Sequence, residues 1–133
     1  MEEIIRVLLV ERMKEPRLVM VENTLKGLQD LVGGQIQVLY PWDDPVVLVC
    51  DEDGKNNCRQ LPNRVIGEEN GCPDIVQGPF FICCTDEDEF ASITDELAKK
   101  YNEKFHWPEM YIHITDTVRA WARLRPDEIE ILF

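Results

Sequence analysis

Short segments rich in β-branched and aliphatic residues, separated by turn formers, dominate this chain and favour a sheet-based fold. Ile4–Arg12 and Arg17–Glu22 flank a turn and predict a hairpin. Pro45–Cys50 is a further β-rich run. Asp74–Thr85 is a longer apolar run interrupted by Gly78-Pro79, and we expect it to be central in the sheet. These segments predict a core built around β-strands.

Four other segments have a weaker strand pattern. Gln35–Tyr40 alternates in polarity and predicts a half-buried strand. Asn63–Ile66 fits either a short strand or a helical turn, and Met110–Ile114 fits a strand. At the end of the chain, Glu128–Phe133 alternates acidic and apolar residues, which predicts an edge strand that could pair with another copy.

Three segments read as turns or loops. Asp51–Asn57 is dense in turn formers, so Pro45–Cys50 is expected to lead into a second hairpin or a wide loop. Glu68–Pro73 predicts a loop. Asp86–Glu89 is a run of four carboxylates, typical of a solvated loop before a helix.

Two helices are predicted from their caps and periodicity, and a third from weaker signals. Thr24 offers an N-cap to a short amphipathic helix that Gly33-Gly34 ends. Thr94 caps a second helix that ends before Pro108. The third helix would begin at Thr115 or Asp116, present an apolar face, and stop at Pro126. The apolar faces of the last two consist of Leu97, Tyr101 and Phe105, and of Val118, Trp121 and Ala122.

A chain of 133 residues is long enough for one core and too short for two independent ones. The predicted elements combine into an α+β domain: a mixed, mostly antiparallel sheet of five or six strands with two or three helices. We expect a single domain over residues 1–133.

The net charge of −12 disfavours direct binding to nucleic acid or to anionic lipid. The N-terminus is acidic where an export signal would be basic, and the apolar runs are far shorter than the ~20 residues of a membrane-spanning helix. The five cysteines form an odd count, which favours reduced thiols. A cytoplasmic protein is therefore expected.

No catalytic or metal-binding pattern of any strength is present. The cysteines lack zinc-site spacing, and Gly54 lies too early in its acidic loop for an EF-hand. Ser92 is the single serine, while His106 and His113 lie together late in the chain. We expect no catalytic residues, no metal and no cofactor. A metal-dependent hydrolase that uses carboxylates remains the least favoured alternative.

Several separated motifs resemble one known family. Thr24–Gln37 leads into Tyr40–Pro45, and three later motifs follow in order: Leu61–Arg64, Asp74–Ile82 and Phe90–Glu96. These motifs are similar to a domain-of-unknown-function family that is common in phages and conjugative elements of Firmicutes. The resemblance covers about residues 4–105 and implies a small accessory protein of a mobile element, with no catalytic residues to carry over. Residues 106–133 are then a C-terminal extension packed on the core formed by residues 1–105.

The leading hypothesis is a non-catalytic protein that binds and inhibits a host factor and acts as an anti-defence protein. An acidic surface that imitates DNA could occupy a basic groove of that factor. A separate basic cluster could grip an acidic or phosphorylated partner, although a solvated helix face is the favoured reading. That cluster consists of Arg119, Trp121, Arg123 and Arg125.

The alternative hypothesis is a sponge that sequesters a small nucleotide signal in a pocket. Aromatic faces stack on bases, and the guanidinium group matches the geometry of phosphate. The candidate ligand-binding residues are Tyr40, Trp42, Asn63, Arg64 and Phe81. The expected partners are thus a host protein or a small nucleotide, with a homodimer also possible.

Overall fold

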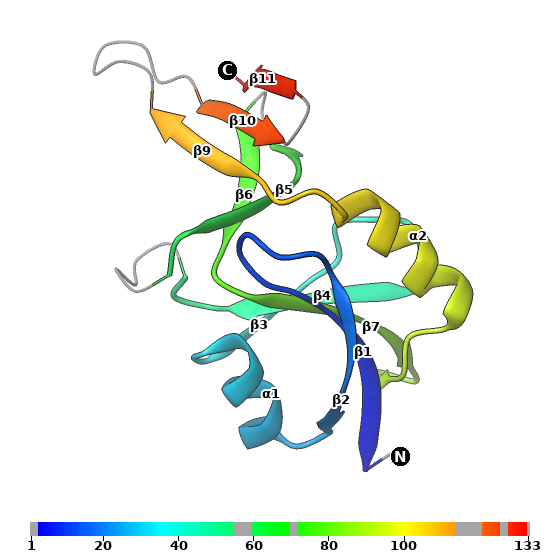
Figure 1. The fold of residues 1–133 in the computed structure, drawn as a ribbon. Helices are drawn as coiled ribbons and strands as arrows, with labels where there is room; N and C mark the ends of the chain where they lie inside the picture. Colours follow the sequence, from blue (N-terminus) through cyan, green and yellow to red (C-terminus); the bar gives the residue numbers. More distant parts are fainter. Residues whose placement is uncertain (1–2, 55–59, 70–71, 114–120, 126–127, 133) are drawn as a thin grey trace.

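A six-stranded antiparallel sheet forms the body of the molecule (Figure 1). The computed structural model describes residues 3–54, 60–69, 72–113, 121–125 and 128–132. The strands follow the order β2-β1-β7-β4-β3, and β8 also pairs with β7. Their bounds are β1 Ile4–Val10, β2 Arg17–Glu22, β3 Ile36–Leu39, β4 Val46–Asp51, β7 Phe80–Asp86 and β8 Glu89–Ala91. With two helices, this sheet confirms the predicted α+β class.

The two faces of the sheet are covered by different helices. Helix α1, Leu25–Val32, packs its buried residues on one face, and α2, Asp95–Phe105, packs on the other. Alternation along β1 divides its side chains between the two apolar clusters. Strand β4 is buried at every position because it is covered on both faces. Strand β7 lies between β1 and β4, so the central position predicted for this apolar run is confirmed.

Both helix starts follow the predicted capping chemistry. The Thr24 hydroxyl accepts a hydrogen bond from the Gly27 N–H at 3.0 Å, and the Thr94 hydroxyl accepts one from the Leu97 N–H at 3.3 Å. Gly33 ends α1 at a φ of 83°, a left-handed conformation that glycine adopts without a steric penalty. These three positions are confirmed.

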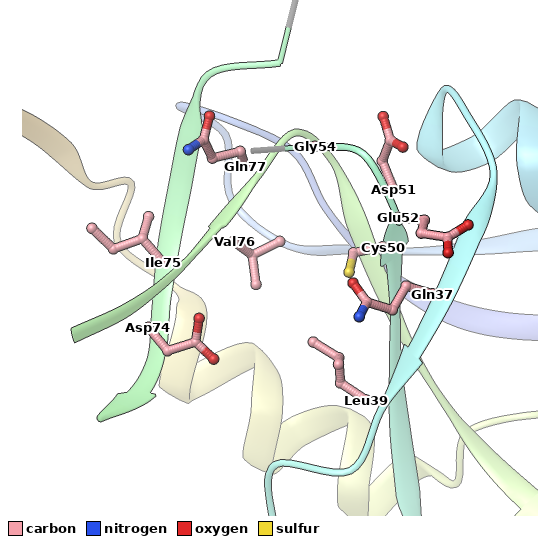
Figure 2. Close-up of a pocket in the computed structure, with 10 residues that line it drawn as sticks. All are labelled: Gln37, Leu39, Cys50, Asp51, Glu52, Gly54, Asp74, Ile75, Val76 and Gln77. Carbon is pink, nitrogen blue, oxygen red and sulfur yellow. The ribbon is translucent and has the colours of Figure 1, made fainter. Parts of the chain in front are cut away.

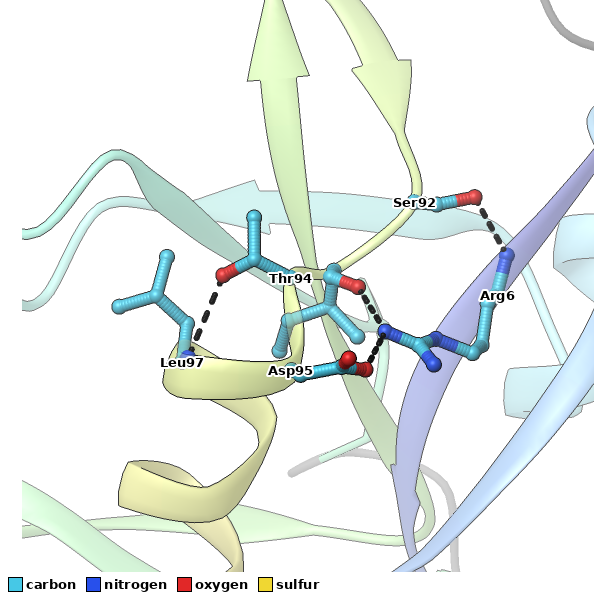
Figure 3. A network of polar contacts seen from close by, with 6 residues as sticks. Arg6, Ser92, Thr94, Asp95 and Leu97 are labelled. Atoms are coloured by element: carbon cyan, nitrogen blue, oxygen red, sulfur yellow. Dashed lines mark hydrogen bonds and ion pairs between the residues drawn. The ribbon is translucent and has the colours of Figure 1, made fainter.

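Polar contacts between β1 and the start of α2 fix the helix over the sheet (Figure 3). The Arg6 N–H donates to the Ser92 hydroxyl at 2.9 Å. The Arg6 guanidinium donates to the Ile93 carbonyl at 2.7 Å and lies 2.7 Å from an Asp95 carboxylate oxygen. One arginine therefore aligns the first turn of α2 with the strand beneath it.

A second group of strands lies at one end of the main sheet (Figure 1). Strands β5, Pro62–Glu69, and β6, Cys72–Gln77, form a two-stranded sheet. Strands β9, β10 and β11 form a three-stranded sheet in the order β11-β10-β9. Their bounds are β9 Met110–His113, β10 Trp121–Arg125 and β11 Glu128–Leu132. The C-terminal edge strand is confirmed up to Leu132, and Phe133 lies outside the described residues.

The segments that follow β4 and β5 differ in part from the sequence-based expectations. Strand β4 pairs with β3 and β7, so the hairpin expected after Cys50 is wrong, while the alternative of a wide loop falls largely on residues 55–59, outside the described residues. Glu68–Pro73 is not simply a loop, because β5 continues to Glu69 and β6 begins at Cys72. The turn formers in this segment mark the end of a hairpin, and pairing between the strands extends its two arms.

The third helix predicted for the C-terminal region is wrong where the structure describes it. Trp121–Arg125 forms β10, which pairs with β9 and β11. A pattern of apolar and basic residues over only five positions fits a helix as well as a strand. Here, pairing with two neighbouring strands stabilises the strand. The remaining positions of that prediction, Thr115, Asp116, Val118 and Pro126, lie outside the described residues.

The carboxylate run before α2 is a hairpin turn rather than a loop that leads into the helix. Glu87 and Asp88 have φ values of 48° and 67° and connect β7 to β8. Positive φ at both central residues is typical of a type I′ turn, in which Asp is well tolerated. All four carboxylate residues of Asp86–Glu89 are exposed.

Neither helix in the described part of the chain is long and apolar enough to cross a lipid bilayer.

Candidate functional site

A cleft of about 340 Å³ opens between the β3–β4 edge of the main sheet and strand β6 (Figure 2). Gln37 and Leu39 line it from β3, and Asp74 and Val76 line it from β6. Figure 2 shows these two pairs of side chains facing each other across the opening, with Cys50 of β4 between them. The cleft therefore depends on how the two-stranded sheet is held against the main sheet.

One wall of the cleft is fixed by the buried carboxylate of Asp51. Its Oδ1 accepts a hydrogen bond from the Asp53 N–H at 2.9 Å, and its Oδ2 accepts one from Gln60 Nε2 at 3.1 Å. The same Gln60 nitrogen donates to the Val32 carbonyl at the end of α1, also at 3.1 Å. A Cβ atom on Gly34 would lie 2.7 Å from Asp51 Oδ1, so only glycine fits beside this carboxylate. Asp51 thus organises the loop that follows β4.

The remaining polar lining gives the cleft an acidic rim over an apolar floor. Glu52 is exposed and Asp74 is half-buried, so both carboxylates accompany the amides of the lining. Leu39, Cys50 and Val76 supply the apolar floor. The ten lining residues within the described part of the chain include no Lys, Arg or His. This arrangement suits a group with a cationic head and an apolar stem, which is the chemistry of Lys and Arg side chains.

The two aromatic candidates for ligand stacking lie in different environments. Tyr40 is 74% exposed at the end of β3. Trp42 is half-buried, with its ring centroid 4.6 Å from that of Tyr101 and 5.8 Å from that of Phe105. Trp42 therefore anchors its segment to α2, while Tyr40 projects into solvent.

Asp44, close to Trp42, is held by two groups of α2. Its Oδ2 accepts hydrogen bonds from Lys100 Nζ and from the Tyr101 hydroxyl, both at 2.6 Å. These bonds lower the pKa of the Asp44 carboxyl below its ordinary value. Burial and the same carboxylate raise the pKa of the Tyr101 hydroxyl. Asp44 therefore stays ionised and clamps the proline-rich segment onto α2.

Replacing Asp44 by Asn should lower stability near neutral pH and matter less in acid. The native pKa of Asp44 is depressed, so its stabilising effect is present above the unfolded carboxyl pKa of about 3.9. That effect is lost as the pH falls through the lower native value. Urea unfolding of wild type and Asp44→Asn across this range measures the difference. Asp43→Asn, at an exposed neighbouring carboxylate, is the control. A difference that stayed constant with pH would contradict the clamp.

Asn63 and Arg64 are completely buried on β5. Asn63 Nδ2 donates to the carbonyls of Val10 and Gly78, both at 2.9 Å. The Arg64 guanidinium donates to Asn63 Oδ1 and to the Lys14 carbonyl, each at 2.7 Å. These two side chains therefore bind backbone carbonyl groups and each other. Neither of them points into an opening large enough for a ligand.

The structure does not bring the five proposed ligand-binding residues into one pocket. Phe81 exposes none of its surface and belongs to the cluster on the α1 face of the sheet. Trp42 packs against the cluster on the opposite face. Arg64 is enclosed at the end of α2, where it donates to the Phe105 carbonyl at 3.1 Å.

The proposed basic cluster lies on a strand rather than on a helix. Trp121, Arg123 and Arg125 occupy alternate positions of β10, and Arg119 lies outside the described residues. In the β10–β11 register, Arg123 is opposite Glu130 and Arg125 is opposite Glu128. The basic positions therefore stand across from acidic positions of the same sheet.

The described thiols are structural in their placement. Cys50 and Cys83 are buried, and Cys84 is partly buried. The adjacent Cys83 and Cys84 pack against opposite faces of the sheet, as expected for neighbours on a strand. Burial raises the pKa of the Cys83 thiol to about 12, which suppresses its thiolate form. Among the described residues, no group of three or more metal-ligating side chains gathers in one place.

Sequence reasoning missed the cleft because no local pattern indicates it. Gln37 is a polar position on an alternating strand, and Asp74 is the single acid within β6, so each reads as an ordinary solvent-facing residue. Their juxtaposition depends on β6 lying beside the β3–β4 edge, a contact between segments far apart in sequence.

One of three comparisons with known proteins gave a match. Residues 5–106 match the model of a protein family that is described as a domain of unknown function. This result confirms a domain-of-unknown-function family and the extent of the resemblance, expected over about residues 4–105, to within one residue at each end. No curated protein and no solved structure matches the chain.

Proposed function

Because this chain belongs to the DUF3846 family, a domain of unknown function, we propose a function from its geometry. The chain is a non-catalytic binding protein whose acidic cleft accepts a basic side chain of a partner protein. The observation that carries this proposal is a cleft whose described lining combines a carboxylate rim with an apolar floor and contains no basic residue.

The chemistry of the cleft favours an arginine or lysine of a protein over a free metal ion. The Leu39 and Val76 side chains offer contact to the methylene groups of such a residue. Glu52 and Asp74 supply the charge for its head group, and Gln37 adds an amide acceptor. A small hydrated cation would gain nothing from the apolar floor.

The charge of the whole chain supports the same kind of partner. A net charge of −12 attracts a basic surface over distances comparable to the Debye length, about 8 Å at physiological ionic strength. Proteins that bind DNA carry such surfaces, and an acidic protein can occupy them in place of the phosphates. We therefore propose inhibition of a nucleic-acid-binding host factor. The sequence motifs resemble a family that is common in mobile elements, and this resemblance implies the same setting for the chain. We therefore propose a defence factor of the host as the partner.

Reversing the charge at the rim tests the proposal. Glu52→Lys should weaken binding of an arginine-rich peptide by about tenfold, equivalent to about 1.4 kcal/mol, measured by fluorescence anisotropy at fixed salt. Glu96→Lys makes the same change of net charge at an exposed position on α2 and serves as the matched control. Equal losses for both variants would show a general charge effect and would remove the cleft from the proposal.

The partner itself can be sought with the same pair of variants. Wild type and Glu96→Lys, immobilised and exposed to a bacterial lysate, should retain a protein that Glu52→Lys loses. That protein should bind duplex DNA, and the wild-type chain should displace the DNA. A retained protein without affinity for nucleic acid would contradict the DNA-mimic mechanism.

The geometry supports nucleotide sequestration less well. The residues suited to that role lie apart, with Phe81 and Arg64 fully enclosed and Tyr40 exposed. Native mass spectrometry of the protein purified from bacterial cells distinguishes the two functions. A mass equal to one chain or to an exact multiple of it agrees with protein binding, whereas an additional bound species of nucleotide mass would establish the sponge instead.

A further inference from the structure

Strand β2 lies at one edge of the main sheet, and no other strand within the described residues pairs with its outer side. The Asn23 N–H donates to the Glu3 carbonyl at 2.8 Å, so these two residues form a hydrogen-bonded pair. Such pairs alternate along an antiparallel ladder. Leu18, Met20 and Glu22 therefore direct their N–H and C=O groups away from β1, toward the open edge.

The contacts of β1 support this assignment. Arg6 is the register partner of Met20, and its backbone groups point away from β2. The Arg6 N–H donates to the Ser92 hydroxyl (Figure 3), and its carbonyl accepts from the Ile93 N–H, each at 2.9 Å. Arg6 and Met20 are thus a non-hydrogen-bonded pair, as the alternation requires.

The open edge lacks the features that usually prevent strands from associating. Leu18 is 45% exposed and Met20 is 64% exposed, both on the α2 face of the sheet. No charged residue or proline interrupts the four positions between Arg17 and Glu22. Edge strands of monomers are commonly blocked by lysine, proline or a bulge. An exposed apolar strand of this kind is typical of a covered edge.

We propose that a second copy of this chain covers the edge by antiparallel pairing of β2 with β2, around a two-fold axis perpendicular to the sheet. The register places Leu18 opposite Met20 of the other copy and Val19 opposite itself. The open backbone groups of Leu18 and Met20 then bond to each other in both halves of the interface. The two six-stranded sheets become one continuous sheet.

The side chains select this register over the next one. In the next register, both strands are moved by one residue. Met20 would then lie opposite Met20 of the other copy, and Leu18 would lie opposite the Glu22 carboxylate of the other copy. The proposed register joins apolar residues on both faces of the sheet, and it keeps like charges apart.

Charge complementarity favours a second copy as the occupant. A groove of about 380 Å³ runs beside Leu18, and α2 lines it with Lys99 and Glu103, one turn apart. The third charged residue of the lining, Asp95, is already paired with Arg6 at 2.7 Å. The two-fold axis makes the two α2 helices antiparallel, so the order of Lys99 and Glu103 is reversed from one copy to the other and opposite charges can approach each other. Strand β2 carries one basic and one acidic end, so two chains of net charge −12 can meet there without local repulsion.

Two double variants test the strand pairing and its register. Leu18→Lys combined with Met20→Lys places like charges opposite each other in the proposed register and should abolish the dimer. Leu18→Lys combined with Met20→Glu places opposite charges there and should retain it. The first variant also makes the net charge less negative, so loss of the dimer could not follow from overall repulsion. Both positions are exposed in the monomer, so both variants should fold.

Sedimentation velocity at about 100 µM, in about 0.15 M and 0.5 M salt, measures the state of each protein. The wild type should sediment with twice the 15.5 kDa chain mass, more completely at the higher salt because screening reduces repulsion. Leu25→Lys, at an exposed position on α1, should leave the dimer unchanged. A monomeric wild type at both salts, or a dimer that survives both double variants, would overturn the proposal.

Hydrogen exchange of the wild type gives an independent readout. The amides of Leu18 and Met20 should be protected in the dimer and should exchange rapidly after dilution to monomer. Protection at the amides of Val19 and Val21, which face β1, should persist in both states. Rapid exchange at Leu18 and Met20 in a confirmed dimer would place the interface elsewhere. The dimer does not rest on the proposed cleft function, because Glu52 lies outside β2.

Discussion

Replacing Arg64 by Met is expected to lower the free energy of unfolding by about 3–5 kcal/mol, because it leaves several hydrogen-bond acceptors without their donor. Arg64 exposes none of its surface, and its hydrogen bonds to Asn63 Oδ1 and to the Phe105 carbonyl are buried. The substitution removes the guanidinium cation, but the hydrogen-bond acceptors that this cation contacts remain. The Lys14 carbonyl, the Phe105 carbonyl and Asn63 Oδ1 would each lose a charged donor. A buried acceptor left without its donor costs about 1–3 kcal/mol.

The position of Arg64 at the end of α2 adds to this effect. The Phe105 carbonyl is at the C-terminus of the helix, where aligned peptide dipoles give a partial negative charge. The guanidinium supplies the complementary charge, and its planar fork reaches two other segments of the chain at once. Lysine retains the charge without the fork, so Arg64→Lys should lie between wild type and Arg64→Met.

Urea unfolding followed by circular dichroism measures these differences. The midpoint should fall in the order wild type, Arg64→Lys, Arg64→Met, with an unchanged slope. Arg17→Met makes the same substitution at an exposed arginine and should shift the free energy by less than about 1 kcal/mol. If Arg64→Met unfolded at the same urea concentration as wild type, Arg64 would not carry the role assigned to it.

Replacing Phe81 by Ala should cost about 3–5 kcal/mol of stability. Phe81 lies on the central strand, with Leu9 of β1 and Val49 of β4 as its register partners. Its ring is fully enclosed beneath α1, so truncation leaves a cavity that its neighbours cannot fill. The loss should appear in unfolding experiments whether or not any ligand is present.

Tyr40→Ala is the matched control for the other aromatic candidate. Tyr40 is 74% exposed, so truncation should change the free energy of unfolding by less than about 0.5 kcal/mol. A loss below about 1 kcal/mol for Phe81→Ala would contradict its placement in the core.

Local chemistry made much of the fold predictable. The hydroxyls of Thr24 and Thr94 and the left-handed Gly33 act within a few residues of their own positions, so the sequence alone indicates the helix ends. The hairpin of β1 and β2 follows from two strand-forming runs around a short turn. The long apolar run of β7 matches a strand that is covered on both faces.

The candidate sites were less predictable because they depend on contacts between distant segments. Arg64 follows Pro62-Asn63 in a segment that reads as polar, and its burial results from the approach of α2 and the β1–β2 connection. On a strand covered on both faces, alternation does not show which side Phe81 occupies. The cleft similarly requires β6 to lie beside β3, which no pattern in either strand indicates.

The order of strands in the main sheet has a consequence for synthesis on the ribosome. The β1–β2 pair and the β3–β4 pair are each local, yet neither pairs with the other. Strand β7 joins them, and it follows both of them in the chain. Until Phe80–Asp86 emerges from the ribosome, these two pairs cannot be joined and their inner edges stay open. The most vulnerable interval for aggregation or proteolysis therefore comes before β7 is released, and a stall in translation just upstream of it would prolong that interval.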